Sequence, residues 1–443
     1  MISGSDAPAQ YVRLAFMIDR LFPGYIDAYC GRRCAARLSP LIDFPGYIDA
    51  YCGPPELRSE ALSGEKPSLE VLRESASSLR QSIVEDNTLT PDRRAFLKEE
   101  LRAMCTTIEI LAGNGLSIVD EVELLYGLKA EWVDESVFEG AHSTLEEVLP
   151  GPEPLRERVQ AFRDRSRVPV EVAASVISWV ADTIRTRTRS VFGLPTHEDC
   201  EISFVADRPW RAYNWYLGKG KSRIEFNRDA PFEMWDIPIA VAHEMYPGHH
   251  TERTVKEYRL YVEEKRLEHC IALNNTPSAL ISEGIATNAL EVIASRDEIE
   301  AMLVECYERA GLQKSDGERA VAFAEAYRQL ERVVDNQALL LYGRHASDDE
   351  VVGYGVRYAL TTHEDERLAL RFLKDPLSRS YTYNYTLGGD LVAAFLDRAE
   401  DRRQAFWRLL SEPLTPTRLR SELSACAGRY LEADILSRIG RGG

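Results

Sequence analysis

Residues 237–250 read Ile-Pro-Ile-Ala-Val-Ala-His-Glu-Met-Tyr-Pro-Gly-His-His, an apolar run followed by a cluster of histidines. The stretch opens with an apolar run, with Asp236 in a capping position and Pro238 where a first helical turn tolerates proline. This pattern predicts a buried helix that ends near His243 and Glu244. Three of the chain's eight histidines fall in the last eight residues of the stretch, beside a glutamate, and such clustering indicates a metal site.

The spacing of these histidines departs from the usual zinc-peptidase motif His-Glu-x-x-His, in which two histidines one helical turn apart bind the metal. Position 247 is proline, and the histidines follow at 249 and 250. On a regular helix, at about 100° per residue, His249 would point away from His243, and His250 would lie about 10.5 Å further along the axis. Pro247 removes a helical hydrogen bond and Gly248 tolerates unusual dihedrals, so we expect a kink that delivers one of the two. His249 is favoured over His250, and the other would support the ligands or contact substrate.

An open catalytic zinc site needs a third protein ligand and leaves one position for water. The best candidate is Glu283, in Ile281-Ser-Glu-Gly-Ile-Ala286, on a helical stretch that follows Thr276-Pro277. A surface carboxylate near a helix start is the competing interpretation of the same residue. We therefore expect one zinc ion, with ligands drawn from His243, His249, His250 and Glu283.

Between about residues 200 and 228 the hydrophobic period changes to two. Three strands are predicted, at Glu201–Val205, Tyr213–Leu217 and Ser222–Asn227, the last two joined by a Gly-Lys-Gly-Lys hairpin connection. We expect a small antiparallel β-sheet that precedes the active-site helix.

Helical patterns dominate elsewhere, so the predicted fold class is mainly α, a large helical body with that one small sheet. The clearest helix has Thr90 as N-cap and Pro91 in its first turn, with one apolar face formed by Leu97, Leu101, Met104, Ile108 and Leu111. A Pro/Gly cluster near residue 150 and the later change of period suggest two parts. These are an N-terminal helical part, 1–195, and a catalytic metallohydrolase part, 196–443.

A ten-residue segment occurs twice without a change, at 22–31 and again at 44–53. Two copies with an unrelated spacer lack the three or more units that a solenoid needs. We interpret the repeat as a local tandem duplication or a sequence-assembly error, not as a functional device. The second copy runs into Pro54-Pro55-Glu56-Leu57, which reads as its natural continuation.

The length, charge and composition of the chain limit the classes of function that it can have. The 443 residues can bury a large core, and the net charge of −17 argues against a nucleic-acid partner, which would need clustered Lys and Arg. The N-terminus lacks a secretory pattern and no segment approaches a membrane span, so we expect a cytoplasmic protein without a membrane partner. The eight scattered cysteines are expected to be free thiols. The oligomeric state is left open.

The stretch from His243 to His250, together with Ser282-Glu-Gly-Ile-Ala286, resembles the bacterial family catalogued as domain of unknown function 885, whose hallmark is His-Glu-x-x-Pro-Gly-His-His. The likeness extends to Pro-Gly-Tyr-Ile-Asp-Ala-Tyr near the N-terminus and to Tyr385-Thr-Leu-Gly388. That family is in turn similar to thermolysin-type zinc peptidases, whose downstream helix carries a glutamate ligand. The resemblance implies that Glu283 is a ligand and that a sheet edge lies beside the site. Strand 222–227 is the one expected to pair with an extended peptide.

The motif and the family resemblance together predict a zinc metallopeptidase that hydrolyses short peptides through a metal-bound water. Glu244 would move the proton, and the resemblance implies that Tyr385 stabilises the developing oxyanion. Alternatively, Tyr385 only packs within the aromatic stretch 381–385. The histidine that does not bind metal is then the other candidate for the hydrogen-bond donor to the oxyanion. A zinc hydrolase of a non-peptide amide or ester, and a non-catalytic binding protein with a vestigial metal site, are the alternative functions. The substrate and the choice between exo- and endo-cleavage are left open.

Overall fold

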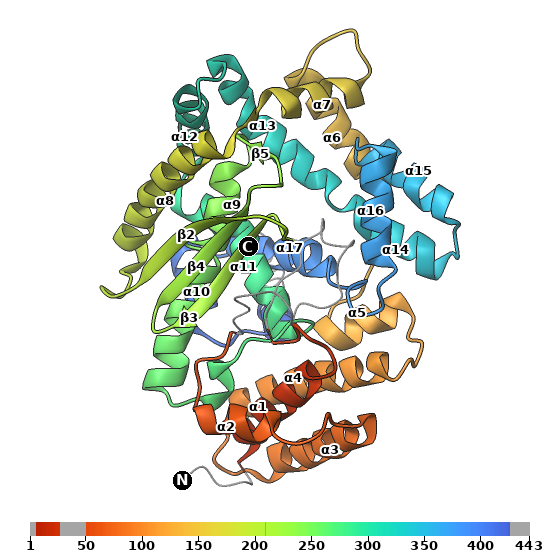
Figure 1. The fold of residues 1–443 in the computed structure, drawn as a ribbon, viewed down its shortest axis with the longest axis vertical. Helices are drawn as coiled ribbons and strands as arrows, with labels where there is room; N and C mark the ends of the chain where they lie inside the picture. The colour runs from red at the N-terminus through yellow and green to blue at the C-terminus, as the bar shows by residue number, and fades with distance from the viewer. Residues whose placement is uncertain (1–5, 27–49, 209, 426–443) are drawn as a thin grey trace, which may run out of the picture.

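The computed structural model describes residues 6–26, 50–208 and 210–425 (Figure 1). Helices make up most of it, which confirms the mainly α class. They are α1 (Ala7–Asp19), α2 (Pro55–Leu62), α3 (Leu69–Glu85), α4 (Pro91–Leu111), α5 (Ile118–Tyr126), α6 (Glu135–Val148), α7 (Leu155–Arg165), α8 (Val170–Phe192), α9 (Ile237–Glu244), α10 (His249–Lys256), α11 (Pro277–Ile293), α12 (Arg296–Arg309), α13 (Lys314–Leu330), α14 (Val333–Gly343), α15 (Asp348–Tyr358), α16 (His363–Leu373), α17 (Tyr383–Asp397) and α18 (Arg402–Ser411).

The predicted strands form one small sheet on the side of the molecule where α10 lies (Figure 1). β2 (Asp199–Val205), β4 (Lys221–Asn227) and β3 (Ala212–Gly218) stand in that order, and a two-residue pairing of β1 (Arg167–Val168) with β5 (Phe232–Glu233) lies apart. The β3–β4 hairpin is antiparallel as expected, but β2 pairs with β4 in parallel, so the sheet is mixed. β4 is the central strand and both of its edges are paired. The expectation that 222–227 adds a peptide strand is therefore wrong, and β3 is the edge strand on the side of the cleft described below.

Local sequence signals place the helix starts. Thr90 accepts a hydrogen bond from the backbone N–H of Arg93 at the start of α4, and Thr276 accepts one from Ala279 at the start of α11. In both helices proline fills the first turn, where its missing N–H costs nothing. Asp236 was expected to cap α9 but makes no capping bond, because its carboxylate pairs with Arg211 instead.

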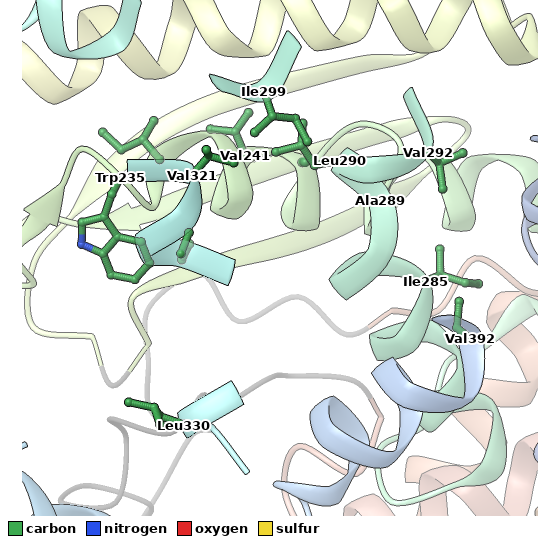
Figure 2. Packing of buried hydrophobic residues seen from close by; sticks show 14 of the residues in the cluster. Trp235, Val241, Ile285, Ala289, Leu290, Val292, Ile299, Val321, Leu330 and Val392 are labelled. Carbon is green, nitrogen blue, oxygen red and sulfur yellow. The ribbon is translucent and has the colours of Figure 1, made fainter. Parts of the chain in front are cut away.

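Two large hydrophobic cores and one small cluster on α15 and α16 organise the described residues. The smaller of the two large cores is built from α1–α4 and residues 270–273, and the larger extends from Ala103 to Leu419 and includes the helices that carry the motif. Figure 2 shows Val241 of α9, Ile285 and Ala289 of α11 and Val392 of α17 within the larger core. Helices on both sides of residue 195 pack into this core, so the two predicted parts share it.

Each copy of the duplicated segment contributes half of one short ladder. In the first copy, Ile26 bridges Leu273 and the carbonyl of Tyr25 accepts from the N–H of Asn274 at 2.8 Å. In the second copy, Tyr51 bridges Ile271, and the N–H of Cys52 donates to the carbonyl of Cys270 at 2.8 Å. The described residues of the two copies, 22–26 and 50–53, therefore both pair with residues 270–274, and residues 27–49 lie outside the described chain.

Five cysteines fall in the described ranges, at positions 52, 105, 200, 270 and 306, and all are free thiols as predicted. Cys30, Cys34 and Cys426 lie outside those ranges. Among the helices described, none is long and apolar enough to span a bilayer.

Candidate metal centre

The motif is carried by two short helices with a break between them. α9 ends at Glu244, Tyr246-Pro247 is a cis peptide, and α10 begins at His249. At the break, the N–H of Gly248 donates to the carbonyl of Ala242 at 3.0 Å. A Cβ at Gly248 would lie 2.0 Å from the carbonyl oxygen of His243, so only glycine lets the chain turn back this closely. The predicted kink is confirmed.

The break brings His249, not His250, beside His243. One nitrogen of each of these two rings and one carboxylate oxygen of Glu283 lie within 4.8 Å of one another. Among the described residues, no other group of three or more His, Cys, Asp or Glu side chains is arranged so that it could hold a metal ion. The Nε2 atom of His243 is 3.3 Å from Oε2 of Glu283, and Nε2 of His249 is 3.7 Å from the same oxygen. Tetrahedral zinc with bonds of about 2.0–2.2 Å separates its ligand atoms by about 3.3–3.6 Å. The three side chains therefore fit a zinc ion in identity and in spacing.

The buried oxygen Oε2 of Glu283 supports the same fit. It accepts no hydrogen bond within the described chain, although Glu283 is buried, with 5% of the residue exposed. The other oxygen, Oε1, accepts a hydrogen bond from the Tyr381 hydroxyl at 3.1 Å. A buried carboxylate oxygen needs a positive charge or a donor close to it, and a cation between it and the two imidazoles would supply that charge.

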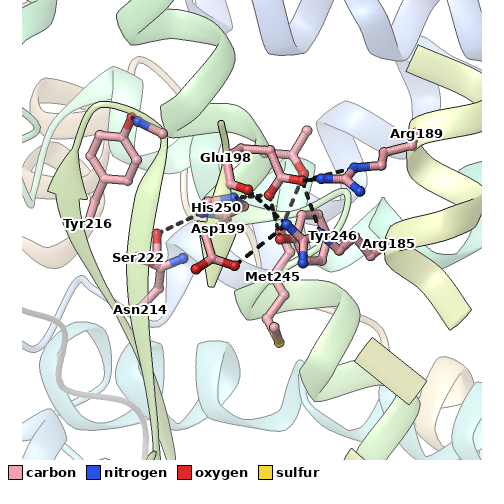
Figure 3. Close-up of polar contacts among 12 residues, drawn as sticks. Arg185, Arg189, Glu198, Asp199, Asn214, Tyr216, Ser222, Met245, Tyr246 and His250 are labelled. Carbon is pink, nitrogen blue, oxygen red and sulfur yellow. Dashed lines mark hydrogen bonds and ion pairs between the residues drawn. The ribbon is translucent and has the colours of Figure 1, made fainter. Parts of the chain in front are cut away.

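His250, also named as a candidate ligand, points away from this group. Its Nδ1 is 2.8 Å from Oγ of Ser222 and its Nε2 is 3.0 Å from Oε2 of Glu198. Figure 3 draws both contacts. The ring is fully buried, and both nitrogens are engaged. His250 is therefore neither placed to bind the metal nor open to substrate.

Glu198 is the centre of this buried network. Its Oε2 also accepts the Tyr246 hydroxyl at 2.6 Å, and its Oε1 accepts from Arg185 and Arg189 (Figure 3). Burial raises the pKa of Glu198, but the hydrogen bonds from His250 and Tyr246 and the arginine Arg185 outweigh it and bring the value to about 2. Burial lowers the pKa of His250, so the ring is neutral, donates from Nε2 to the ionised carboxylate and accepts from Ser222 at Nδ1. The network fixes the turn that holds His249.

A second carboxylate stands behind His249. Oε2 of Glu252 is 4.0 Å from Nδ1 of His249, and the Ser282 hydroxyl, which donates to Glu252, is 3.3 Å from the same nitrogen. Lys256 donates to the other oxygen of Glu252 at 2.6 Å. A carboxylate and a hydroxyl at the far nitrogen of a ligand histidine fix the ring and its tautomer, as is common in zinc sites.

The charges of the ligand group complement one another without a metal. Burial lowers the pKa of His249, but the Glu283 carboxylate and Glu252 outweigh it and raise the value to about 10. Burial raises the pKa of Glu283, but His249 and His243 lower it to about 2. A proton on His249 therefore takes the place of a cation, and a metal must displace it.

Glycines bring α11 and α17 into backbone contact at the site. A Cβ at Gly284 would lie 2.3 Å from the carbonyl oxygen of Gly388, and a Cβ at Gly388 would lie 2.4 Å from that of Leu280. This close approach sets Glu283 against the start of α17. Gly284 and Gly388 thus have a packing role, because any side chain at either position would separate the two helices.

Tyr385 lies beside the group, as predicted. Its ring stacks on that of His243 with centroids 6.2 Å apart, and it packs edge-on against Tyr381 at 6.0 Å. Packing and a donor role are compatible at this position, so its catalytic role stays a prediction.

The ligand group opens into a cleft of about 460 Å³. Glu244, His249 and Glu283 line it together with Asn214 of the edge strand β3. The side-chain N–H of Asn214 donates to the backbone carbonyl of Glu244 at 2.6 Å, while its buried Oδ1 has no donor in the described chain. Asn214 thus brings an unsatisfied acceptor to the wall of the cleft.

Sequence reasoning missed several of these residues. Glu252 lies three positions after His249 and Ser282 adjoins Glu283, so helical spacing and adjacency could have found them. Tyr381 was seen only as part of an aromatic stretch. Glu198 and Asn214 carry no local signal, because only the sheet brings them to the motif.

Comparisons with known proteins leave the family open. No protein-family model matches the chain, and no curated protein does. A solved structure of a protein from Colwellia psychrerythraea, provisionally named a lipoprotein, aligns at 14% identity and a TM-score of 0.49, covering 81% of this chain and 66% of that one. Another, from Shewanella oneidensis, provisionally named a lipoprotein and of unknown function, aligns at 11% identity and 0.47, covering 83% and 75%. The resemblance to domain of unknown function 885 stays a prediction.

Proposed function

We propose that this chain is a zinc-dependent peptidase that hydrolyses short peptides. The observation that carries the proposal is the group of His243, His249 and Glu283, of which His249 and Glu283 line a cleft together with Glu244. Zinc bound by these three side chains would polarise a carbonyl and lower the pKa of a water molecule towards neutrality. The remaining steps fall to residues of the chain.

Glu244 is proposed as the general base and acid. Glu244 follows His243 at the end of α9, and its buried side chain lines the cleft. The carboxylate takes a proton from the attacking water and passes it to the leaving amine as the C–N bond breaks. The water oxygen remains in the new carboxyl group, and the proton ends on the amine product.

Two neutral side chains would position the substrate. Oδ1 of Asn214 can accept an N–H of the peptide, which favours amide substrates over esters because esters lack that donor. The Tyr385 hydroxyl is the proposed donor to the carbonyl oxygen as negative charge develops there. The cleft, about 460 Å³ with its open mouth included, is the proposed place of a short peptide.

The test combines metal analysis with turnover. Protein purified without chelators should contain about one zinc per chain and should cleave members of a panel of short peptides faster than acylated small molecules. Removal of zinc by a chelator should stop the reaction, and zinc added back should restore it. Glu244→Gln should keep the zinc and lose at least about a hundredfold in kcat. Zinc-free protein, or a Glu244→Gln variant as active as the parent, would overturn the proposal.

A further inference from the structure

The two oxygens of the Glu283 carboxylate have different partners. Oε2 lies 3.3 Å from Nε2 of His243 and 3.7 Å from Nε2 of His249, and it accepts no hydrogen bond within the described chain. Oε1 accepts a hydrogen bond from the Tyr381 hydroxyl at 3.1 Å. One oxygen therefore faces the two imidazoles, while the other is held by a tyrosine that has no role in the proposed chemistry.

The segment before α17 that carries Tyr381 is fixed by contacts with distant parts of the chain. The Arg379 guanidinium donates to Glu121 of α5 at 2.8 Å. The side-chain N–H of Asn275, which lies just before α11, donates to the backbone carbonyl of Leu377 at 3.0 Å. These bonds tie the segment to α5 and to the start of α11, so the fold itself holds the tyrosine in place.

The Tyr381 hydroxyl has one proton to donate. A phenol donates a single hydrogen bond, and an ionised carboxylate only accepts. Since Oε1 of Glu283 is 3.1 Å away and only 8% of the tyrosine is exposed, this proton is directed at the glutamate. The hydroxyl cannot donate to a substrate carbonyl at the same time, which is the role proposed for the neighbouring Tyr385.

We infer that Tyr381 is a positioning residue of the zinc site, which holds Oε1 of Glu283 away from the metal so that the carboxylate binds through Oε2 alone. Groups that bond to a metal ligand orient it, and a second carboxylate oxygen on zinc would fill a coordination position. Two imidazoles and one carboxylate oxygen leave the fourth position for water and allow a fifth ligand in the transition state. The inference rests on the zinc site of the proposed function but not on peptide hydrolysis.

A crystal structure of the full-length zinc-loaded chain tests the inference without any substitution. We expect Oε2 of Glu283 at about 2.0–2.2 Å from zinc, with Oε1 outside bonding distance and still hydrogen-bonded to Tyr381. Zinc bonded to both oxygens, or to Oε1 with the tyrosine released, would overturn the inference alone. Zinc absent from Glu283 would overturn the proposed site and the inference together.

Tyr381→Phe removes the hydroxyl and keeps the ring that packs edge-on against Tyr385. Without its donor, Oε1 of Glu283 can approach the metal, so cobalt(II) placed in the site should show the weaker visible absorption of five coordination. Zinc affinity, measured by competition with a chromogenic chelator, should fall by about tenfold to a hundredfold, the usual effect of losing a group that orients a ligand. A cobalt spectrum identical to that of the parent would overturn the inference, whatever the stability or activity of the variant.

Two other tyrosine variants separate positioning from stability. Tyr354→Phe, on α15, removes a hydroxyl that donates to Glu135 of α6 at 3.3 Å, and neither residue lines the cleft. It should lower the thermal midpoint but keep the parent cobalt spectrum and zinc affinity. Tyr385→Phe should lower kcat and also keep both metal readouts. An equal change of spectrum in either control would show a general loosening of the fold and overturn the inference.

The metal readouts also separate this inference from the proposed function. If the parent cleaves no peptide but Tyr381→Phe changes the cobalt spectrum while both controls keep it, the peptidase proposal fails and the positioning role stands. If peptides are cleaved and the cobalt spectrum of Tyr381→Phe matches that of the parent, the peptidase proposal stands and the positioning role fails.

Discussion

Nε2 of His243 on α9 lies 3.3 Å from Oε2 of Glu283 on α11, and Nε2 of His249 on α10 lies 3.7 Å from the same oxygen. One carboxylate oxygen therefore joins three helices at a single point. The arrangement depends on Glu283 more than on either ring, because the carboxylate is the member shared by both pairs.

Removing the Glu283 carboxylate should release the metal. Glu283→Ala leaves two histidines, one ligand fewer than an open zinc site uses, so zinc content should fall well below one per chain. Glu291→Ala on the same helix is the control, because this glutamate pairs with arginines at the surface. Metal analysis of the purified proteins decides the outcome, with circular dichroism to show that both fold. Full zinc content in Glu283→Ala would assign the third ligand elsewhere.

Alanine substitutions of the adjacent residues His249 and His250 should have different effects on zinc content and stability. His249→Ala should lose zinc, because its ring faces the ligand group. His250→Ala should retain zinc but unfold at lower temperature, since Glu198 and Ser222 would lose a buried partner, at about 1–3 kcal/mol. Zinc content and thermal denaturation of the two variants check both statements. Loss of zinc by a folded His250→Ala protein, with His249→Ala unaffected, would reverse the assignment.

Zinc affinity should rise with pH. The pKa of His249 is raised to about 10 in the metal-free protein, so its proton stabilises the fold fully below the unfolded value of about 6.5, and that contribution is lost as pH rises through 10. Zinc must displace this proton, so the affinity should increase by about tenfold per pH unit between 7 and 9. Competition with a chromogenic chelator over this range measures the slope. A flat profile, after correction for the chelator's own protonation, would contradict a protonated His249.

The glycine at the helix break should be sensitive to one added methyl group. In Gly248→Ala the Cβ would meet the carbonyl oxygens of His243 and Ala242 at 2.0 and 2.4 Å, and backbone cannot move aside as a side chain can. We expect a loss of about 1–3 kcal/mol in stability together with weaker zinc binding. Gly353→Ala, in the exposed middle of α15 with open space around it, should be neutral or slightly stabilising. Equal thermal midpoints for the two variants would show that the break tolerates a side chain.

The sequence predicts the site residues that belong to a local motif, but not the residues that the fold brings in from distant positions. His243, Glu244 and Glu283 belong to local strings, and the kink between His243 and His249 follows from proline and glycine chemistry. The direction of the kink does not, because it is set by Glu198 and Ser222, which the sheet brings to His250 from distant positions. The parallel β2–β4 pairing was missed for a related reason, since alternation identifies a strand but not its partner.

Deletion of one copy of the duplicated segment tests whether the repeat has a function. Ile26 bridges Leu273 and Tyr51 bridges Ile271, so the first copy supplies the start of the ladder and the second supplies its end. Deleting residues 27–48 leaves one intact copy, with Ile26 followed directly by Asp49. In the shortened chain, Asp49 and Ala50 would lie between Ile26 and Tyr51, whereas only Ala272 lies between their partners Leu273 and Ile271. A β-bulge accommodates this one extra residue. We expect the shortened chain to keep its zinc and a thermal midpoint within a few degrees of the parent, measured by metal analysis and calorimetry. A deletion variant that folds but loses zinc would show that the duplication supports the metal site, and our interpretation of it as a local repeat without function would be wrong.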